Sequence, residues 1–500
     1  MKNNLRTLLL AIPLAVLSMA SAAFADNYGD KDSWANREPY PYISPTPGEI
    51  PIIGWGVYSD TMYSIYEDYM DCGFNATLEL DYGNRTKKMI SMLNPTAGKD
   101  TIKLALIPRF DFCLGKQPYQ MPEVVDHFLD LLQERRSPEN RTPTAGWFLV
   151  DEPAYHKFDK LAPYFHSIAQ YDTTRMTWLN LFGDPRDIKS LGPDGDPNSN
   201  DALRNYIETF CEKFKPGVLS YDYYPFVVTP DGRDTTSVTT RLKDFYTALQ
   251  LYSEISKKRN RPFWAFCQSL ATCITDEPDY KPKSGHPAPT EEFLRFEAFN
   301  ALAFGAQGIE YWRYKESYPR KANDTNYYAL VTAEGVKTPA WDFAKKVNKE
   351  IKDHTHVFLG ARLESYYFVG DPQDTDYCDY RRGASEDAIS VRDINQRDTV
   401  GSNRGALVST LVNDGRRYVV IVNQSPYEPA RLELAINDRD YEVSRLQSLE
   451  PATLGSEPAD ITDAADLNGI DLDVRRFVRI TLAPAQYAIY QYSPKPASRL

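Results

Sequence analysis

The chain has 500 residues, with 57 Lys and Arg against 69 Asp and Glu and a formal net charge of -12. This length exceeds one ordinary hydrophobic core and predicts two domains. The acidic balance, without any clustered run of Lys and Arg, argues against a nucleic-acid partner, because phosphate contacts need such clusters. The 34 Tyr, 7 Trp and 23 Phe suit stacking on sugar rings, and equally suit the packing of a large core.

The first 25 residues have the pattern of a cleavable secretory signal. Basic Lys2 and Arg6 precede an apolar stretch from Leu8 to Val16, and a small-residue tail ends at Ala25. These features predict export, with a mature chain that begins near Asp26. No cysteine stands at the cleavage point, and no later apolar run is long enough to span a bilayer. We expect a secreted or periplasmic protein without a lipid anchor or a membrane span.

Eight short apolar runs follow in chain order, separated mostly by patterns of helical period. The predicted strands are Ile52 to Ser59, Phe74 to Leu80, Ile102 to Phe110, Gly146 to Pro153, Met176 to Phe182, Val218 to Pro225, Pro262 to Gln268 and Gly308 to Tyr314. The predicted helices are Met62 to Cys72, Glu123 to Arg135, Lys160 to Tyr171, Asp201 to Lys213, Ser237 to Lys258, Glu291 to Phe304 and Pro339 to Lys352. This count and alternation predict an α/β fold, a (β/α)8 TIM barrel.

Beyond Leu359 the pattern changes to short alternating runs with turn residues between them. The predicted strands here are Ser365 to Val369, Gly405 to Val412, Arg417 to Val422, Ala430 to Ile436, Arg476 to Leu482 and Tyr487 to Tyr492. Asn413-Asp414-Gly415, between two of these runs, is a strong hairpin signal. We predict a signal peptide over residues 1–25, the barrel with an N-terminal arm over 26–358, and a smaller all-β sandwich over 359–500.

The run Gly146 to Pro153 ends in two adjacent acids, Asp151 and Glu152. Pro153 cannot donate to a sheet ladder, so the strand should stop with both acids at its C-terminal end, where barrels of this type keep their active sites. Glu152 is the candidate general acid, because partial burial and the neighbouring Asp151 raise the pKa of a carboxyl. An alternative is that Asp151 and Glu152 cap the following helix near His156.

Cleavage of a glycosidic bond usually needs a second carboxyl group, which attacks the anomeric carbon or activates water. Asp222, at the end of the sixth predicted strand, is the leading partner, because strand ends around one barrel mouth can approach each other. Glu310, at the eighth strand, is the competitor. It has its own alternative role, since it could pair with Arg313 or Arg109 and only shape the site.

Polar and aromatic residues at other strand ends are suited to holding a sugar. The predicted substrate-binding residues are Trp55, Arg109, Asn180, Tyr223, Tyr224, Gln268 and Trp312. The ring of Trp312 can stack on one face of a sugar. Tyr223 and Tyr224 could position a sugar ring or hydrogen-bond a carboxylate, or they could equally serve only in packing. The histidines are scattered, and no metal-ligand, phosphate-loop or dinucleotide motif stands out, so we expect neither a metal nor another cofactor.

Three stretches resemble the β-galactosidase-like barrels of secreted bacterial glycoside hydrolases: Gly73-Phe74-Asn75, Trp147 to Pro153, and Phe299 to Trp312. Those proteins often carry a β-sandwich after the barrel, and Ala483 to Tyr490 resembles its closing strand. The resemblance implies that Glu152 is the acid/base. It also implies a nucleophilic Glu at the end of the seventh strand, where this chain has Gln268, an amide that cannot attack as a carboxylate does.

The second carboxylate is therefore Asp222 or Glu310, or the barrel binds sugar without cutting it. Barrels that resemble the α-galactosidases use acids on strands four and six, with the strand-four acid as nucleophile. On that model Asp151 or Glu152 attacks and Asp222 is the acid/base. Because one barrel fold hosts many reactions, the fold does not choose between these roles. We expect a glycoside hydrolase that acts on a polysaccharide or oligosaccharide, with a silent carbohydrate-binding barrel as the alternative. The oligomeric state is left open.

Overall fold

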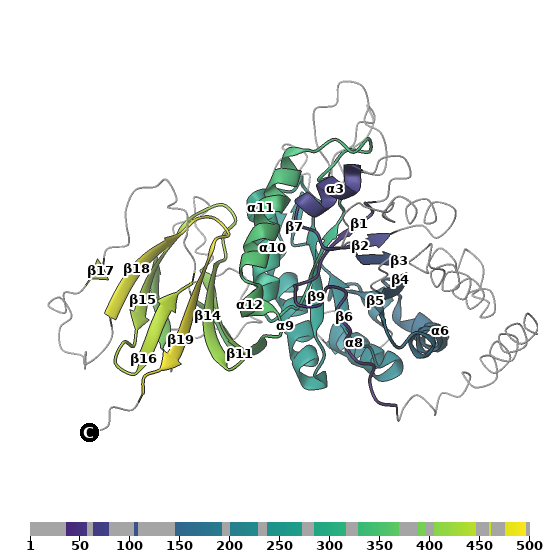
Figure 1. Cartoon of the computed structure of the whole chain (residues 1–500), viewed down its shortest axis with the longest axis horizontal. Coiled ribbons are helices and arrows are strands. Elements are labelled where there is room, and N and C mark those ends of the chain that lie inside the picture. The colour runs from purple at the N-terminus through teal and green to yellow at the C-terminus, as the bar shows by residue number, and fades with distance from the viewer. Residues whose placement is uncertain are drawn as a thin grey trace, which may run out of the picture.

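A computed structural model of the chain consists of a barrel and an all-β part (Figure 1). It describes residues 37–57, 64–79, 105–108, 146–192, 201–228, 238–272, 285–316, 329–369, 388–395, 405–446, 460–461 and 476–496. The predicted signal peptide, the predicted helix Glu123 to Arg135 and Arg109 lie outside the described residues.

Eight parallel strands form one sheet in the order of a (β/α)8 barrel. They are β1 (Ile52–Trp55), β2 (Ala76–Glu79), β3 (Ala105–Pro108), β4 (Gly146–Asp151), β5 (Met176–Phe182), β6 (Leu219–Asp222), β9 (Phe263–Gln268) and β10 (Ile309–Trp312). Hydrogen-bonded neighbours run β3-β2-β1-β10-β9-β6-β5-β4, and β3 contacts β4, so the two ends of the sheet meet. All eight predicted strands are confirmed, most with shorter bounds than predicted.

Helices surround this sheet on its outside (Figure 1). The main ones are α3 (Ser64–Asp71), α6 (Phe158–Tyr171), α8 (Asp201–Phe214), α9 (Leu242–Arg259), α10 (Glu291–Ala303) and α11 (Pro339–Asp353). The helix predicted from Ser237 starts too early, because β8 (Val238–Thr240) pairs antiparallel with β7 (Phe226–Val228) before α9 begins. This small hairpin and the short elements η2 (Tyr155–Lys157), α7 (Ile188–Leu191) and α12 (Thr355–Phe358) were not predicted.

Side chains alternate between the inside and the outside of the barrel, as the two-residue period of a strand requires. In β6, Leu219 and Tyr221 pack outward beneath the helices, so Ser220 and Asp222 face the interior. A separate cluster of large aromatic side chains, which includes Trp178 and Trp264, fills the interior. The lower barrel is thus filled by side chains, and among the described residues the inward polar side chains Asn180, Ser220, Asp222, Gln268 and Glu310 lie toward the C-terminal strand ends.

The all-β part has two antiparallel sheets. One sheet holds β11 (Arg362–Val369), β13 (Ala406–Asn413), β14 (Arg416–Asn423), β19 (Tyr487–Pro494) and β16 (Tyr441–Arg445), and the other holds β12 (Ile389–Asn395), β15 (Ala430–Ile436), β18 (Arg476–Leu482) and β17 (Asp460–Ile461). One hydrophobic cluster joins side chains of both sheets, which makes the pair a β-sandwich. The predicted hairpin is confirmed, with Asp414 and Gly415 at positive φ between β13 and β14. Strands β12, β16 and β17 were not predicted.

Helix α10 lies between the barrel and the sandwich (Figure 1). Its residues from Phe293 to Ala303 are all buried, as expected for a helix that is covered on every side. Phe299 stacks on Tyr487 of the sandwich, with ring centroids 3.7 Å apart. The buried Arg295 is neutralised by Glu291 and Glu350. The two parts therefore share a continuous core, and the predicted boundary at residues 358 and 359 falls between α12 and β11.

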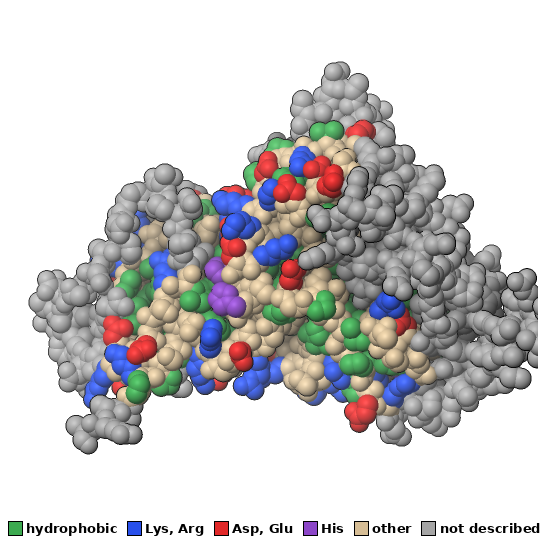
Figure 2. Space-filling view, viewed as in Figure 1, with side chains coloured by type: hydrophobic (Ala, Val, Ile, Leu, Met, Phe, Trp, Pro, Cys, Tyr) green, Lys and Arg blue, Asp and Glu red, His purple; other side chains and the backbone are tan. Residues whose placement is uncertain are grey.

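A second connection lies at the surface, where the turn after β13 reaches α12. The side-chain amide of Asn413 donates to the carbonyl oxygens of His356 and Leu359, at 2.9 and 2.8 Å. Histidine side chains come to the surface between the sandwich and the barrel in Figure 2, where acidic and basic side chains are also mixed. His354, which follows α11, is buried, and burial lowers its pKa to about 4.

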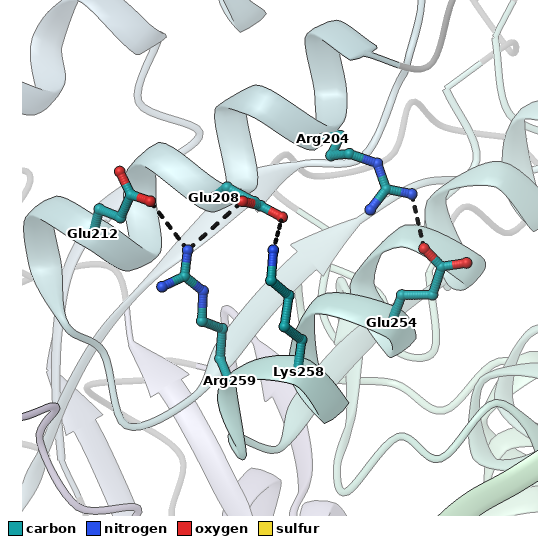
Figure 3. A network of polar contacts seen from close by, with 6 residues as sticks. All are labelled: Arg204, Glu208, Glu212, Glu254, Lys258 and Arg259. Atoms are coloured by element: carbon teal, nitrogen blue, oxygen red, sulfur yellow. Dashed lines mark hydrogen bonds and ion pairs between the residues drawn. The ribbon is translucent and has the colours of Figure 1, made fainter.

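Exposed ion pairs join α8 to α9 on the outside of the barrel (Figure 3). Arg204 lies 2.7 Å from Glu254, and Glu208 lies 2.8 Å from Lys258. Exposed pairs of this kind contribute about 0.2–1 kcal/mol each, so they are suitable places for control substitutions. Within the described residues, every helix is too short or too polar to cross a membrane.

Candidate active site

Strand β4 delivers its two acids through an irregular backbone. The register of β4 against β5 shifts between Phe148 and Asp151, a bulge of the kind that often re-aims a side chain beside an active site. Glu152 follows with φ of 42°, in the left-handed region, and its amide donates to the carbonyl of Asn180 at 3.0 Å. A non-glycine residue in this region costs on the order of 1 kcal/mol, which the surrounding structure must offset.

The alternative of helix capping does not hold for these acids. The residues at the N-caps of η2 and α6 are Ala154 and Lys157, and neither cap has a side-chain hydrogen bond. Asp151 and Glu152 instead face the end of β6.

Asn180 of β5 links the acids of β4 and β6. Its side-chain nitrogen donates to Asp222 Oδ1 at 2.8 Å and to Asp151 Oδ1 at 3.2 Å. Asn180 is 2% exposed, whereas both aspartates are half-buried. One buried amide therefore holds two carboxylates that would otherwise repel each other.

The carboxyl groups of Glu152 and Asp222 share a hydrogen bond. Burial raises the pKa of Glu152 well above its usual value, and repulsion from Asp222 and Asp151 raises it further. Burial also raises the pKa of Asp222, with repulsion from Asp151, but the hydrogen bonds from Asn180 and Glu152 oppose this rise. The pKa of Asp222 rises only to about 7, so Asp222 ionises first and accepts the hydrogen bond, while Glu152 keeps its proton and donates.

Glu310 lies deeper, on β10, and is fully buried. Its Oε2 is 2.6 Å from Ser220 Oγ, which in turn is 3.1 Å from Asn180 Oδ1. Burial raises the pKa of Glu310 to about 8, and the nearby Asp222 and Asp151 act in the same direction. This burial argues against direct attack by Glu310 on a sugar. Ser220 is its hydrogen-bond partner among the described residues, and the suggested pairing with Arg109 involves a residue outside them.

Gln268, at the end of β9, is also buried. It is 2% exposed, and its side-chain amide donates to the carbonyl of Pro287 at 2.9 Å. Its backbone amide donates to Glu297 of α10 at 2.6 Å. The buried Glu297 is a residue that the sequence analysis missed, and burial raises its pKa well above the usual value.

The predicted aromatic contacts separate into two groups. Tyr224 and Trp312 are half-buried and stack on each other, with ring centroids 5.9 Å apart and an angle of 26°. Trp55 is 5% exposed and packs inside the barrel against Phe148, which argues against the predicted sugar contact. Tyr223 is buried too, and its hydroxyl donates to Asp244 at 3.4 Å rather than to an acid of the site.

Two residues of the site, Ser220 and Gly183, escaped the sequence analysis, and a local signal existed for Ser220. Ser220 stands two residues before Asp222 on one strand, so the period of two places both on the inward face. Gly183 follows β5, and a Cβ there would lie 2.3 Å from the carbonyl oxygen of Asp222. Within the described part of the chain, no three His, Cys, Asp or Glu side chains are arranged to hold a metal ion.

Residues 204–354 match the Glyco_hydro_42 family model, described as beta-galactosidase. The matched segment contains Asp222, Gln268 and Glu310. It begins after β4, so Asp151 and Glu152 lie outside it. No curated protein matches the chain. The family match supports glycoside hydrolase function on O-glycosyl bonds and agrees with the resemblance seen in the sequence.

The chain is similar to several solved structures of glycoside hydrolases. A family 39 glycoside hydrolase from Bacteroides cellulosilyticus WH2 has 11% identity and a TM-score of 0.44, with 91% of this chain and 82% of that chain covered. A catalytic mutant of a GH42 β-galactosidase from G. stearothermophilus has 9% identity and a TM-score of 0.46, with 91% and 100% covered. An endo-beta-1,4-mannanase from Thermotoga petrophila has 10% identity and a TM-score of 0.37, with 78% and 96% covered. At these TM-scores the structures do not identify a substrate.

Proposed function

We propose that this protein hydrolyses glycosidic bonds with Glu152 as the general acid and Asp222 as the nucleophile. The supporting observation is the hydrogen bond between these two half-buried carboxyl groups at the C-terminal end of the barrel. A glycosidase needs one protonated and one ionised carboxyl group beside the same bond. The pair supplies both, because Glu152 holds the proton and Asp222 accepts the hydrogen bond from it.

The reaction follows from these protonation states. Asp222 attacks the anomeric carbon while Glu152 gives its proton to the leaving oxygen, so the glycosidic bond breaks and a glycosyl ester forms on Asp222. Glu152, now ionised, takes a proton from a water molecule that attacks the same carbon. The ester breaks, Asp222 is released as a carboxylate, and Glu152 is protonated again.

The close approach of the two groups favours retention of anomeric configuration. Retaining enzymes hold their carboxyl groups roughly 5 Å apart, whereas inverting enzymes keep roughly 6.5 to 9.5 Å so that a water molecule fits. Hydrogen-bonded carboxyl groups leave no such gap. Proton NMR of the first product formed measures the outcome directly: a product of the opposite anomeric form would rule out Asp222 as a nucleophile.

The position of the proton also bears on the reversed assignment, in which a β4 acid attacks and Asp222 donates. That assignment needs an ionised Glu152, and both burial and its acidic neighbours oppose ionisation. Gln268 is no rival, because an amide is a poor nucleophile and its side chain is occupied with Pro287. We further propose that Trp312, stacked on Tyr224, offers its ring to one face of the sugar.

The test measures product release from a panel of plant, algal and host glycans, with binding measured in parallel. The proteins are wild type, Glu152→Gln, Asp222→Asn and the control Glu254→Gln, which alters an exposed acid of the ion pairs in Figure 3. We expect both site variants to bind glycan without turnover and the control to behave as wild type. A wild type that binds a glycan and releases nothing, with equal binding by both site variants, would make the barrel a sugar receptor instead.

We also propose that the protein is exported, on the strength of the charged, apolar and small-residue order in residues 1–25. N-terminal sequencing of the protein recovered from periplasm or medium should give a start near Asp26. Recovery only of chains that begin at Met1 would contradict export.

A further inference from the structure

We propose that Glu310 is a positioning residue that keeps its proton and thereby orients Ser220 and Asn180 toward the two aspartates of the site. Its catalytic consequence rests on the function proposed above. Its protonation state does not, and can be measured without any substrate.

The orientation of Asn180 is fixed by its acidic neighbours. Its nitrogen lies within hydrogen-bond distance of both Asp222 and Asp151. A flipped side chain would set the amide oxygen against two carboxylate oxygens. All three oxygens are acceptors, and none carries a hydrogen to donate. The nitrogen therefore faces the aspartates, and the oxygen of Asn180 must face Ser220.

A count of hydrogen atoms then assigns the proton. Ser220 Oγ contacts Asn180 Oδ1 at 3.1 Å and Glu310 Oε2 at 2.6 Å, but a serine hydroxyl carries a single hydrogen. Because the oxygen of Asn180 has no hydrogen, Ser220 must donate to it. The contact between Ser220 and Glu310 is then a hydrogen bond only if Glu310 donates, as a carboxylic acid does and a carboxylate cannot.

The surroundings of Glu310 favour the same state. Its register partners on the neighbouring strands, Ile53 of β1 and Phe266 of β9, are apolar. The charged groups that act on it are Asp222 and Asp151, both acidic. Its other oxygen, Oε1, is buried without a hydrogen-bond partner in the described structure. An ionised Glu310 would be a third negative charge in this interior, beside Asp222 and Asp151.

The chain of donors runs in one direction, from Glu310 through Ser220 to Asn180 and on to the aspartates. Each donated hydrogen bond polarises the next, so the amide nitrogen of Asn180 becomes a better donor. Loss of the proton would reverse the first bond, because Ser220 would turn to the new carboxylate. Asn180 would then lose its donor, and Asp222 would gain a repelling neighbour.

The protonation state is tested by urea unfolding of wild type and Glu310→Gln between pH 5 and pH 8. Glutamine has the same size, stays neutral and keeps a donor for Ser220. An unfolded glutamate ionises near pH 4.3, so a folded-state pKa near 8 makes wild type lose stability relative to the variant as pH rises through this window. We expect the wild-type urea midpoint to fall steadily relative to that of Glu310→Gln. The other site carboxyls are present in both proteins. While Glu310 is protonated they face a neutral side chain in each protein, so their contributions cancel in the difference.

A difference in midpoint that stays constant from pH 5 to pH 8 would mean that Glu310 is ionised in the folded protein, and would overturn the proposal. Glu254→Gln is the control, since its exposed carboxyl should give a constant difference. This experiment remains decisive even if wild type releases no product from any glycan, an outcome that would count against the proposed function alone.

The positioning role is tested on a glycan that wild type cleaves. Glu310→Met matches the size of glutamate but has no hydrogen-bond donor. It should lower kcat at least about tenfold, because the loss of one hydrogen bond to a charged network raises the barrier by that much. Glu310→Gln should recover most of that loss and move the alkaline limb of the pH profile upward, because glutamine has no proton to lose. Equal kcat values for the two variants, or an unmoved limb, would contradict the role.

Discussion

The carboxyl group of Glu152 donates a hydrogen bond to Asp222, across the strand β5 that separates their own strands. Asn180, on that middle strand, also donates a hydrogen bond to Asp222. One acid with a proton and one without are thus fixed at the same end of the barrel, and this relationship governs the expected behaviour of variants.

Replacing Glu152 by glutamine should lower kcat by about 10²–10⁴, because the leaving oxygen no longer receives a proton. The loss should be much smaller on an aryl glycoside with a dinitrophenol leaving group, which departs without protonation. Initial rates on both substrates measure the ratio. Asp222→Asn is the matched comparison, since a lost nucleophile should slow both substrates alike; equal losses for Glu152→Gln on both would remove it as the general acid.

Replacing Asn180 by alanine should move the acid limb of kcat/KM to higher pH by about one unit. Asp222 must be ionised to attack, and the hydrogen bond from Asn180 lowers the pKa of Asp222 against the effects of burial and Asp151. The pH profile of wild type and variant gives the shift. Asn205→Ala, on the exposed face of α8, is the control and should leave the limb in place.

Replacing Gly183 by alanine should reduce both stability and kcat. The new Cβ would lie 2.3 Å from the carbonyl oxygen of Asp222, so the end of β6 must move, at a cost of about 1–3 kcal/mol in the free energy of unfolding. Urea unfolding and kcat are measured together. Gly48→Ala is the comparison: its φ of 83° strains an alanine, but the new Cβ would meet no atom within 4 Å, so it should lose stability while keeping kcat.

Replacing Trp312 by alanine should raise KM about two- to tenfold with a smaller change in kcat, since a stacking ring contributes about 0.5–1.5 kcal/mol to binding. Tyr224→Phe keeps the ring that stacks on Trp312 and should bind glycan nearly as wild type does. Initial rates give KM and kcat, and calorimetry measures the glycan affinity of both variants. Unchanged affinity in Trp312→Ala would place the sugar elsewhere on the barrel.

Much of the barrel followed from local patterns in the chain. The β6 segment illustrates the reason: outward Leu219 and Tyr221 alternate with inward Ser220 and Asp222, and a strand imposes this period on any sequence that adopts it. Asp414-Gly415 marks the sandwich hairpin for a similarly local reason, because those residues tolerate the positive φ of the turn. Strands β12, β16 and β17 lack such clear signals and were missed.

The sequence by itself determined the order of strands, the change to an all-β part, and the placement of acids at strand ends, since these depend on neighbours along the chain. Only the tertiary structure decided which acids meet. The pairing of Glu152 with Asp222, the burial of Trp55 and Tyr223, and the contact of Ser220 with Glu310 all join segments far apart in sequence. Protonation states belong to this second group, because a carboxyl group gains or loses its proton according to the burial and charge that distant strands create around it.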